Sequence, residues 1–409
     1  MDNILKVETS PFFIYGSLAL MFLLGFPSYT NAAPTPLEIS AQEEIRSQGI
    51  IKRNWFNNFS DYRGNLTEKY GTKFAFLLNY TQQAILDGPN DKGRSQGVWY
   101  WNIEAAQRLW QGAELFTELE VDRGKGVDKL LPTFSGFNDN SGDDANLYIP
   151  VLYLEQTLAG QKVFLAAGKL DLSYWFDCND VANSADTQFL SSALVNNLAL
   201  PFPAKGIGAM ASFTPNDWVY FQAGASSAKA SSTKTGLSNA FSSSFFINEL
   251  GLSSEFGALK GNYRFILSIN HKKSSRINSD KTQENSLSWG LSFDQAITGR
   301  ATLFLRYGFA DPKVSDIAYF WSCGGQITEP VAGRKFDCLG AGVAQSIMGH
   351  DYRQVNDAAR AETIYEAYYS YSLKPALTLT PSIQIVTNPD ADQTVDIEVV
   401  CGLRLLISF

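Results

Sequence analysis

The sequence lacks the features that mark several large classes of protein. Apart from the amino-terminal stretch, no run of residues approaches the roughly eighteen consecutive apolar residues that a membrane-spanning helix needs, so a helical membrane protein is excluded. The four cysteines and two histidines show no metal-finger spacing, so we expect neither zinc nor any other cofactor. The formal net charge of -8 argues against nucleic acid or phosphate as the main partner.

What the sequence does contain is an ordinary apolar fraction that alternates with polar residues. Hydrophobic residues make up 45% of the chain, which resembles a soluble protein, and aromatic residues make up 13%, which is high. A transmembrane β-barrel has this composition, because its apolar and polar residues alternate and average out, and because aromatic residues form its girdles.

The last stretch, Thr394 to Phe409, shows the alternation most clearly. From Val395 to Phe409 the odd-numbered residues are almost all apolar, whereas Asp396, Glu398 and Arg404 share the other parity. Successive side chains of a strand point to opposite faces, so the pattern predicts one strand of about fifteen residues, long enough to cross a bilayer at a tilt. A long edge strand of a soluble sandwich is the alternative for this segment alone.

The amino-terminal region reads differently from the rest. Residues 11–26 form an apolar run, and Thr30-Asn31-Ala32 follows it, so residues 1–32 are interpreted as a secretory signal. A membrane anchor is the alternative. Aromatic residues recur at three- and four-residue spacing between residues 55 and 70, which predicts an amphipathic helical segment over 33–70 on the periplasmic side.

From residue 71 onwards the two-residue period continues to the end, and 71–409 is predicted to be one transmembrane β-barrel. The sixteen predicted strands are 71–86, 98–110, 113–123, 147–158, 162–171, 206–214, 217–228, 245–256, 259–271, 285–297, 299–311, 317–328, 335–347, 361–373, 376–387 and 395–409. An antiparallel, all-β barrel of this size leaves an aqueous channel inside.

The connections between these strands alternate in length. Those after even-numbered strands are tight turns such as Gln111-Gly112, and those after odd-numbered strands are mostly long and polar, such as 124–146, 229–244 and 272–284. Short turns on one rim and long loops on the other are typical of barrels in the bacterial outer membrane. With both chain ends periplasmic, the long loops face outside and the polar parity faces the lumen.

One connection, residues 172–206, is too apolar for an exposed loop. It carries Tyr174, Trp175, Phe176 and Phe189 together with five leucines, and such side chains need burial. The barrel interior is the nearest place to provide it. We therefore expect a constriction loop folded into the channel.

This loop also carries a family resemblance. The run GKLDLSYWFDCNDVANSADTQFLSSALVNN, the following PFPAKGIGA, LTPSIQIVTNP at 379–389 and the closing GLRLLISF resemble segments of the carbohydrate-selective porins of the OprB type. The resemblance covers most of the chain from about residue 54. It implies a sixteen-stranded outer-membrane barrel that passes monosaccharides and similar neutral solutes by diffusion. Cys178 departs from the pattern, where a small polar residue is expected.

Candidate residues for the constriction follow from parity and from the inserted loop. Sugars offer hydroxyl groups to charged and amide side chains and flat CH faces to aromatic rings. The predicted set is Glu104, Arg108, Glu118, Glu120, Asp171, Trp175, Asp177, Asp180, Arg264 and Arg306, with Asn179, Asn183 and Arg404 beside them. The alternative is that these charges pair across the wall and make the barrel rigid.

Other functions remain open at this point. A general porin with weak ion selectivity and no sugar preference is the main alternative, and an adhesin that uses residues 229–244 is another. A barrel enzyme with His271 as base beside Ser274 or Ser275 lacks an obvious group to orient the base, so no enzymatic activity is expected.

The expected partners are small carbohydrates and the lipids and lipopolysaccharide of the outer membrane. The oligomeric state, monomer or trimer, is left open. Cys323 and Cys338 flank a turn almost symmetrically, so either a cross-strand disulfide or two packed thiols fits the spacing.

Overall fold

A computed structural model describes residues 66–409 except 90, 143, 238–239, 241 and 375. The predicted signal at 1–32 and nearly all of the predicted helical segment at 33–70 lie outside the described residues. Residues 66–70 are helical and lead directly into the first strand. No helix in the described part of the chain is long and apolar enough to cross a membrane.

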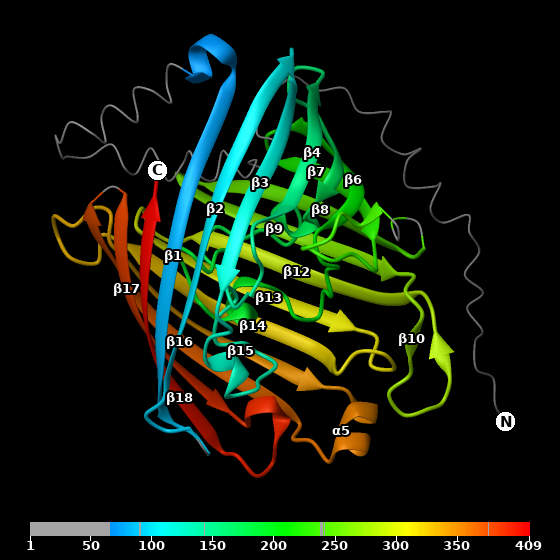
Figure 1. The fold of residues 1–409 in the computed structure, drawn as a ribbon, viewed down its shortest axis with the longest axis vertical. Helices are drawn as coiled ribbons and strands as arrows, with labels where there is room; N and C mark the ends of the chain where they lie inside the picture. Colours follow the sequence, from blue (N-terminus) through cyan, green and yellow to red (C-terminus); the bar gives the residue numbers. More distant parts are fainter. Residues whose placement is uncertain (1–65, 90, 143, 238–239, 241, 375) are drawn as a thin grey trace.

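The strands close into one antiparallel barrel in which each strand pairs with its neighbour in sequence, and the last strand pairs with the first (Figure 1). The barrel strands are β1 (Thr72–Asp87), β2 (Ser95–Trp110), β3 (Ala113–Arg123), β4 (Tyr148–Leu158), β5 (Val163–Leu170), β6 (Gly206–Asn216), β7 (Val219–Ser227), β8 (Ser244–Phe256), β9 (Leu259–Asn270), β12 (Ser286–Ala296), β13 (Ala301–Ala310), β14 (Ile317–Thr328), β15 (Cys338–Met348), β16 (Ala361–Lys374), β17 (Leu377–Thr387) and β18 (Ile397–Ser408). The sixteen predicted strands are confirmed, each boundary within three residues.

Alternation along each strand sorts side chains between the two faces of the wall. On β13, Leu303 and Leu305 are 49% and 45% exposed on the outer face, whereas Phe304 and Arg306 between them are 3% and 0% exposed inside. A one-residue slip would exchange these faces, so the apolar outer surface fixes the register.

The carboxy-terminal strand closes the wall, as its pattern predicts. β18 pairs with β1 from Leu77–Ser408 to Asp87–Val399. At the end, the Phe409 N–H donates to the Phe76 carbonyl at 2.9 Å, and the two rings stack with centroids 5.8 Å apart. Closure therefore leaves no unpaired strand edge exposed to lipid.

Tight turns occupy one rim of the barrel and longer connections the other. Gly112, with φ of +75°, makes the turn between β2 and β3, where a side chain would meet the Thr157 carbonyl. The longer connections include a hairpin, β10 (Ser274–Ser275) with β11 (Thr282–Gln283), and the helix α5 (His350–Asn356). Neither was predicted, because both are too short to show a period.

The buried apolar side chains do not form a core within the wall. They gather inside the lumen in two clusters, where the loops 124–147 and 171–205 pack against the inner face. The disulfide alternative for Cys323 and Cys338 is wrong, because all four cysteines are thiols. Cys323 pairs in register with Val343, whereas Cys338 pairs with Thr328.

Candidate functional site

The connection between β5 and β6, residues 171–205, folds into the lumen and begins with a capped turn. Asp171 precedes the 3-10 helix η3 (Leu172–Tyr174), and its carboxylate accepts from the backbone N–H and the hydroxyl two residues later, at 2.9 and 2.6 Å. Trp175 follows, only 1% exposed, with its ring centroid 5.4 Å from that of Tyr153 on β4. The apolar start of the loop is thus buried against the wall, as predicted.

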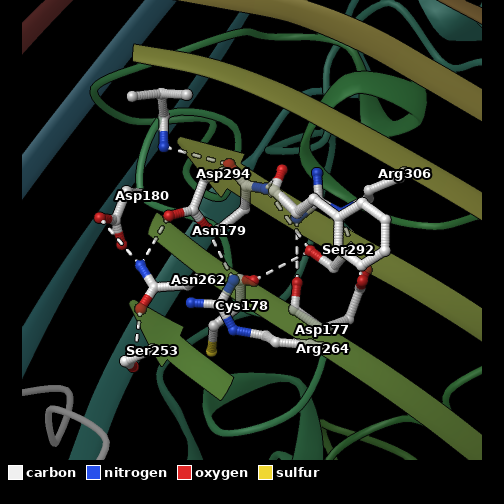
Figure 2. Close-up of polar contacts among 12 residues, drawn as sticks. Asp177, Cys178, Asn179, Asp180, Ser253, Asn262, Arg264, Ser292, Asp294 and Arg306 are labelled. Atoms are coloured by element: carbon white, nitrogen blue, oxygen red, sulfur yellow. Dashed lines mark hydrogen bonds and ion pairs between the residues drawn. The ribbon is translucent and has the colours of Figure 1, made fainter. Parts of the chain in front are cut away.

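Arg306 on β13 holds the middle of this loop (Figure 2). Its Nε lies 3.2 Å from Asp177 Oδ1, and its two terminal nitrogens donate to the carbonyls of Leu194 and Asp177 at 3.2 and 3.0 Å. The other carboxylate oxygen of Asp177 accepts from the Asn197 N–H at 3.0 Å. The two ionic side chains are 0% and 5% exposed. Breaking such a pair is costly, because the remaining partner stays charged and buried.

The next residues of the loop run along β9 and β12, as Figure 2 shows. The Asn179 amide donates to the Phe293 carbonyl at 3.1 Å, and the Ser292 hydroxyl donates to the Cys178 carbonyl at 3.1 Å. Asp180 is an exposed residue of the loop, yet desolvation, together with the neighbouring Asp294, raises its pKa to about 6. This part of the loop therefore follows the wall rather than crossing open space.

Two further side chains of the wall bind the backbone of the loop. Arg404 on β18 donates to the carbonyls of Ala185 and Gln188, the second at 3.0 Å. Glu366 on β16 accepts from the N–H groups of Leu190 and Ser191, at 2.7 and 2.9 Å. These charged groups satisfy backbone atoms that would otherwise be buried without partners.

A second loop, residues 124–147 between β3 and β4, also folds inward. Val127, Leu131 and Phe137 are at most 1% exposed. Glu362 on β16, four residues before Glu366, accepts from the backbone N–H groups of Phe134 and Ser135, at 3.0 and 2.7 Å. The sequence placed this connection among the polar outer loops, and that expectation is corrected here.

The two inward loops join each other inside the lumen. The Ser135 carbonyl accepts from the Ala193 N–H at 2.9 Å and from the Ser191 hydroxyl at 3.0 Å, and the Asp139 N–H donates to the Leu190 carbonyl at 2.9 Å. Together they form one partition, residues 124–147 and 171–205, which we call the inner partition. It narrows the lumen from the side of the long loops.

Carboxylates gather where the inner partition faces β2 and β3. We call this group the acidic arc: Glu118, Glu120 and Asp122 on β3, with Asp171 and Asp186 on the loop. The Tyr174 hydroxyl donates to Glu118 at 2.9 Å, and the Tyr148 hydroxyl donates to Glu120 at 2.7 Å and to Asp122 at 3.1 Å. Asp186 accepts from Asn79 at 2.8 Å, from Asn140 at 3.0 Å and from the Tyr100 hydroxyl.

Lys205 is the cation within the acidic arc. Its Nζ lies 3.6 Å from both Glu118 and Glu120, and its side chain is 21% exposed. Burial would lower the pKa of Lys205, but the carboxylates of Glu118, Glu120 and Asp171 outweigh burial and raise that pKa. The arc thus carries five carboxylates, three of which act on the ammonium group of Lys205. It also carries tyrosine and asparagine side chains that can exchange hydrogen bonds with hydroxyl groups.

Comparison with known proteins identifies this architecture. The family model described as carbohydrate-selective porin, OprB family, matches residues 87–409. The chain belongs to the OprB family of carbohydrate-selective porins. Its place is therefore the bacterial outer membrane, and its family is one of channels rather than of enzymes.

Individual proteins resemble this OprB-family chain in fold or in sequence. OprB from Pseudomonas putida at high pH matches with a TM-score of 0.77 at 18% identity, over 86% of this chain and 97% of that one. The low-pH structure of that protein gives 0.56 over 87% and 98%, also at 18% identity. Porin AaxA of Chlamydia pneumoniae is 27% identical over 315 residues, covering 75% of this chain and 70% of that protein.

The predicted site residues of this OprB-family porin fall into three groups. Glu118, Glu120 and Asp171 belong to the acidic arc, and Glu104 lies beside it, paired in register with Glu118. Trp175, Asp177, Asp180, Arg264 and Arg306 line the contact between the loop and the wall, where Arg264 pairs with Asp294 at 2.6 Å. Arg108 is exposed near the tight-turn rim, in register with Glu114 and about 13 Å along the strand from Glu104. A role in solute binding stays a prediction for each.

Several residues of this architecture escaped sequence reasoning. Lys205 and Asp186 in the arc, and Glu362 and Glu366 on β16, were not in the predicted set. The alternation along the strand did place Glu362 and Glu366 on the lumen face. Their spacing of four residues could have indicated that both face the lumen. The apolar residues Val127, Leu131 and Phe137 could have marked the second inward loop.

Proposed function

We propose that the chain forms a channel through which monosaccharides and similar small neutral solutes diffuse across the outer membrane. The observation that supports this most is the acidic arc, where Glu120 and Lys205 reach water at 16% and 21% side-chain exposure beside the tyrosines of the arc. Carboxylates, an ammonium group and phenols offer the acceptors and donors that replace the water bound to sugar hydroxyls.

The inner partition supports the same proposal by reducing the opening. A sixteen-stranded barrel with an empty lumen passes solutes with little choice. Here the partition occupies part of the lumen with buried apolar side chains such as Phe137, Phe189 and Leu194, which are all 0% exposed. The path left for a solute then runs beside the polar arc, where hydrogen bonds are exchanged in both directions.

Swelling of proteoliposomes tests this function. Purified protein in vesicles should admit arabinose and glucose much faster than a tetrasaccharide, because the partition limits the width of the solute. Empty vesicles provide the baseline. Equal swelling rates for glucose with and without protein would refute the proposed channel for monosaccharides.

A general porin with weak ion selectivity is the second candidate, and the acidic arc favours a preference for cations. The arginines that could balance the arc, Arg264, Arg306 and Arg404, are at most 7% exposed and lie against the inner partition or its neighbouring wall. Zero-current potentials in a salt gradient measure this preference directly. Adding glucose to the same bilayer separates the two candidates, since a channel with sugar affinity is blocked by glucose and a general porin is not.

A further inference from the structure

The wall carries a recess at the rim of the long loops. It has a volume of about 590 Å³ and lies where β13, β14 and β15 end beside α5. Figure 1 shows α5 at the end of the barrel opposite the chain's carboxy terminus. Because long loops mark the outer surface of such barrels, the recess sits at the level of the outer leaflet.

The floor of the recess is apolar and faces lipid. Tyr307, Tyr319 and Ile347 line it, and all three lie on the outward parity of their strands. Tyr319 is 41% exposed and packs on Phe309 with ring centroids 5.4 Å apart. Next to them Trp289 stacks on Phe309 at 6.4 Å. Aromatic rings gathered in this way on the outer face mark the boundary between the acyl chains and the head groups.

The rim of the recess is basic. Lys313, Arg353 and Arg360 line it, and within the described residues none of the three has a carboxylate within 4.0 Å. The one acidic side chain of the lining, Asp351, lies 3.6 Å from His350 instead. The Nε of Arg353 is buried and has no hydrogen-bond partner in the part of the chain that the structure describes. Arg353 therefore carries its positive charge at the recess without a carboxylate partner among the described residues, and an anionic ligand would supply one through the other guanidinium nitrogens.

From this arrangement we propose that the recess binds a phosphorylated glycolipid of the outer leaflet, the lipid A part of lipopolysaccharide. Its phosphate would bind between Lys313, Arg353 and Arg360, since guanidinium groups bind phosphate through paired hydrogen bonds. Its acyl chains would descend over Tyr307, Tyr319 and Ile347. A soluble anion could bind the cations of the rim, but it would make no contact with the apolar floor. A basic rim beside an apolar floor therefore favours an amphiphilic ligand.

Binding of lipid A to the purified porin in detergent, measured by native mass spectrometry, tests the proposal. The wild-type protein should bind bisphosphorylated lipid A at least about tenfold more tightly than the same lipid with both phosphates removed, because the cations recognise the phosphate. The triple variant Lys313→Gln/Arg353→Gln/Arg360→Gln should lose that difference.

A matched control removes three cations from loops on the same rim. Lys229→Gln/Lys234→Gln/Lys272→Gln changes the net charge equally at exposed positions outside the recess, and it should bind like the wild type. The proposal is overturned by equal affinity for the two lipids, by full affinity in the recess variant, or by displacement of the lipid with millimolar inorganic phosphate. Should the recess variant fail to fold, the comparison of the two lipids on the wild type still decides.

Discussion

The ion pair of Arg306 with Asp177 makes a strong prediction about the constriction loop. Replacing Arg306 with methionine keeps most of the side-chain volume but removes the guanidinium group and its three hydrogen bonds to the loop. It also leaves the Asp177 carboxylate buried without its partner. Removing one member of such a pair costs about 3–5 kcal/mol, so the loop should leave the wall in a large fraction of molecules.

The thiol of Cys178 reports this release, since it follows Asp177 directly. Burial, and next the neighbouring Glu249, raise the pKa of Cys178 from its ordinary 9.0 to about 12. At pH 8 a fall of three pKa units increases the reactive thiolate roughly a thousandfold. With Cys323, Cys338 and Cys401 changed to alanine, the Arg306→Met variant should react with iodoacetamide about 100 to 1000 times faster than its parent.

Two further variants make the test specific. Arg306→Met/Asp177→Asn removes both charges and keeps an acceptor for the Asn197 N–H, so it should recover part of the slow labelling. Arg334→Met breaks an ion pair with Asp337 at a turn between strands and should leave labelling unchanged. Single-channel conductance should rise most in Arg306→Met, less in the double variant and not in Arg334→Met. Labelling of Arg306→Met at the parental rate would refute this account of the loop.

Three other perturbations have defined outcomes. Glu366→Gln should lower the free energy of unfolding by about 1.5–3 kcal/mol, because one of the two carboxylate oxygens that accept backbone N–H groups is replaced by an NH2 donor. Urea titrations of vesicle-bound protein measure this loss, and an unchanged midpoint would contradict it. Glu120→Gln/Asp171→Asn should reduce the preference for cations about fourfold for each charge removed, because a cation ~5 Å from a carboxylate in water is attracted by ~0.8 kcal/mol. Reversal potentials in a salt gradient measure the preference, and an unchanged potential would contradict this expectation. Burial raises the pKa of Asp128 to about 6 from 3.8. The folded protein therefore binds more protons than the unfolded protein between these pH values, so the folded loop 124–147 loses stability as the pH rises from 4 to 6. Its protection against amide hydrogen exchange should fall over this range in the wild type and not in Asp128→Asn.

Most of the wall could be predicted from the sequence because each strand carries its own local signal. On β13 the residues from Ala301 to Phe309 alternate with few errors, and the lipid outside demands that alternation on every strand. The constriction loop at 171–205 was also predictable, since its aromatic residues could not stay in water. Its boundaries agree with the predicted 172–206 to within one residue.

The roles of the lumen charges could not be predicted in the same way. Parity places Arg306 and Glu120 on the same face of the wall, but it does not say which of them a loop will cover. Arg306 is 0% exposed beneath the loop, whereas Glu120 keeps 16% of its side chain in water. The difference in exposure depends on where the constriction loop, distant in sequence, packs against the wall. The residues of a single strand do not specify that packing.

Because of the two glutamates of β16, the width of the pore depends on the order in which the strands assemble into the barrel. Glu362 meets Ser135 across 227 residues, and Glu366 meets Leu190 across 176. Until the fourteenth strand of the wall has been inserted, both loops lack these acceptors, and a half-built barrel would be a wide and unselective leak. The leak would be avoided if the strands assembled from the carboxy-terminal side, or if the barrel were released into the membrane only after β18 had paired with β1.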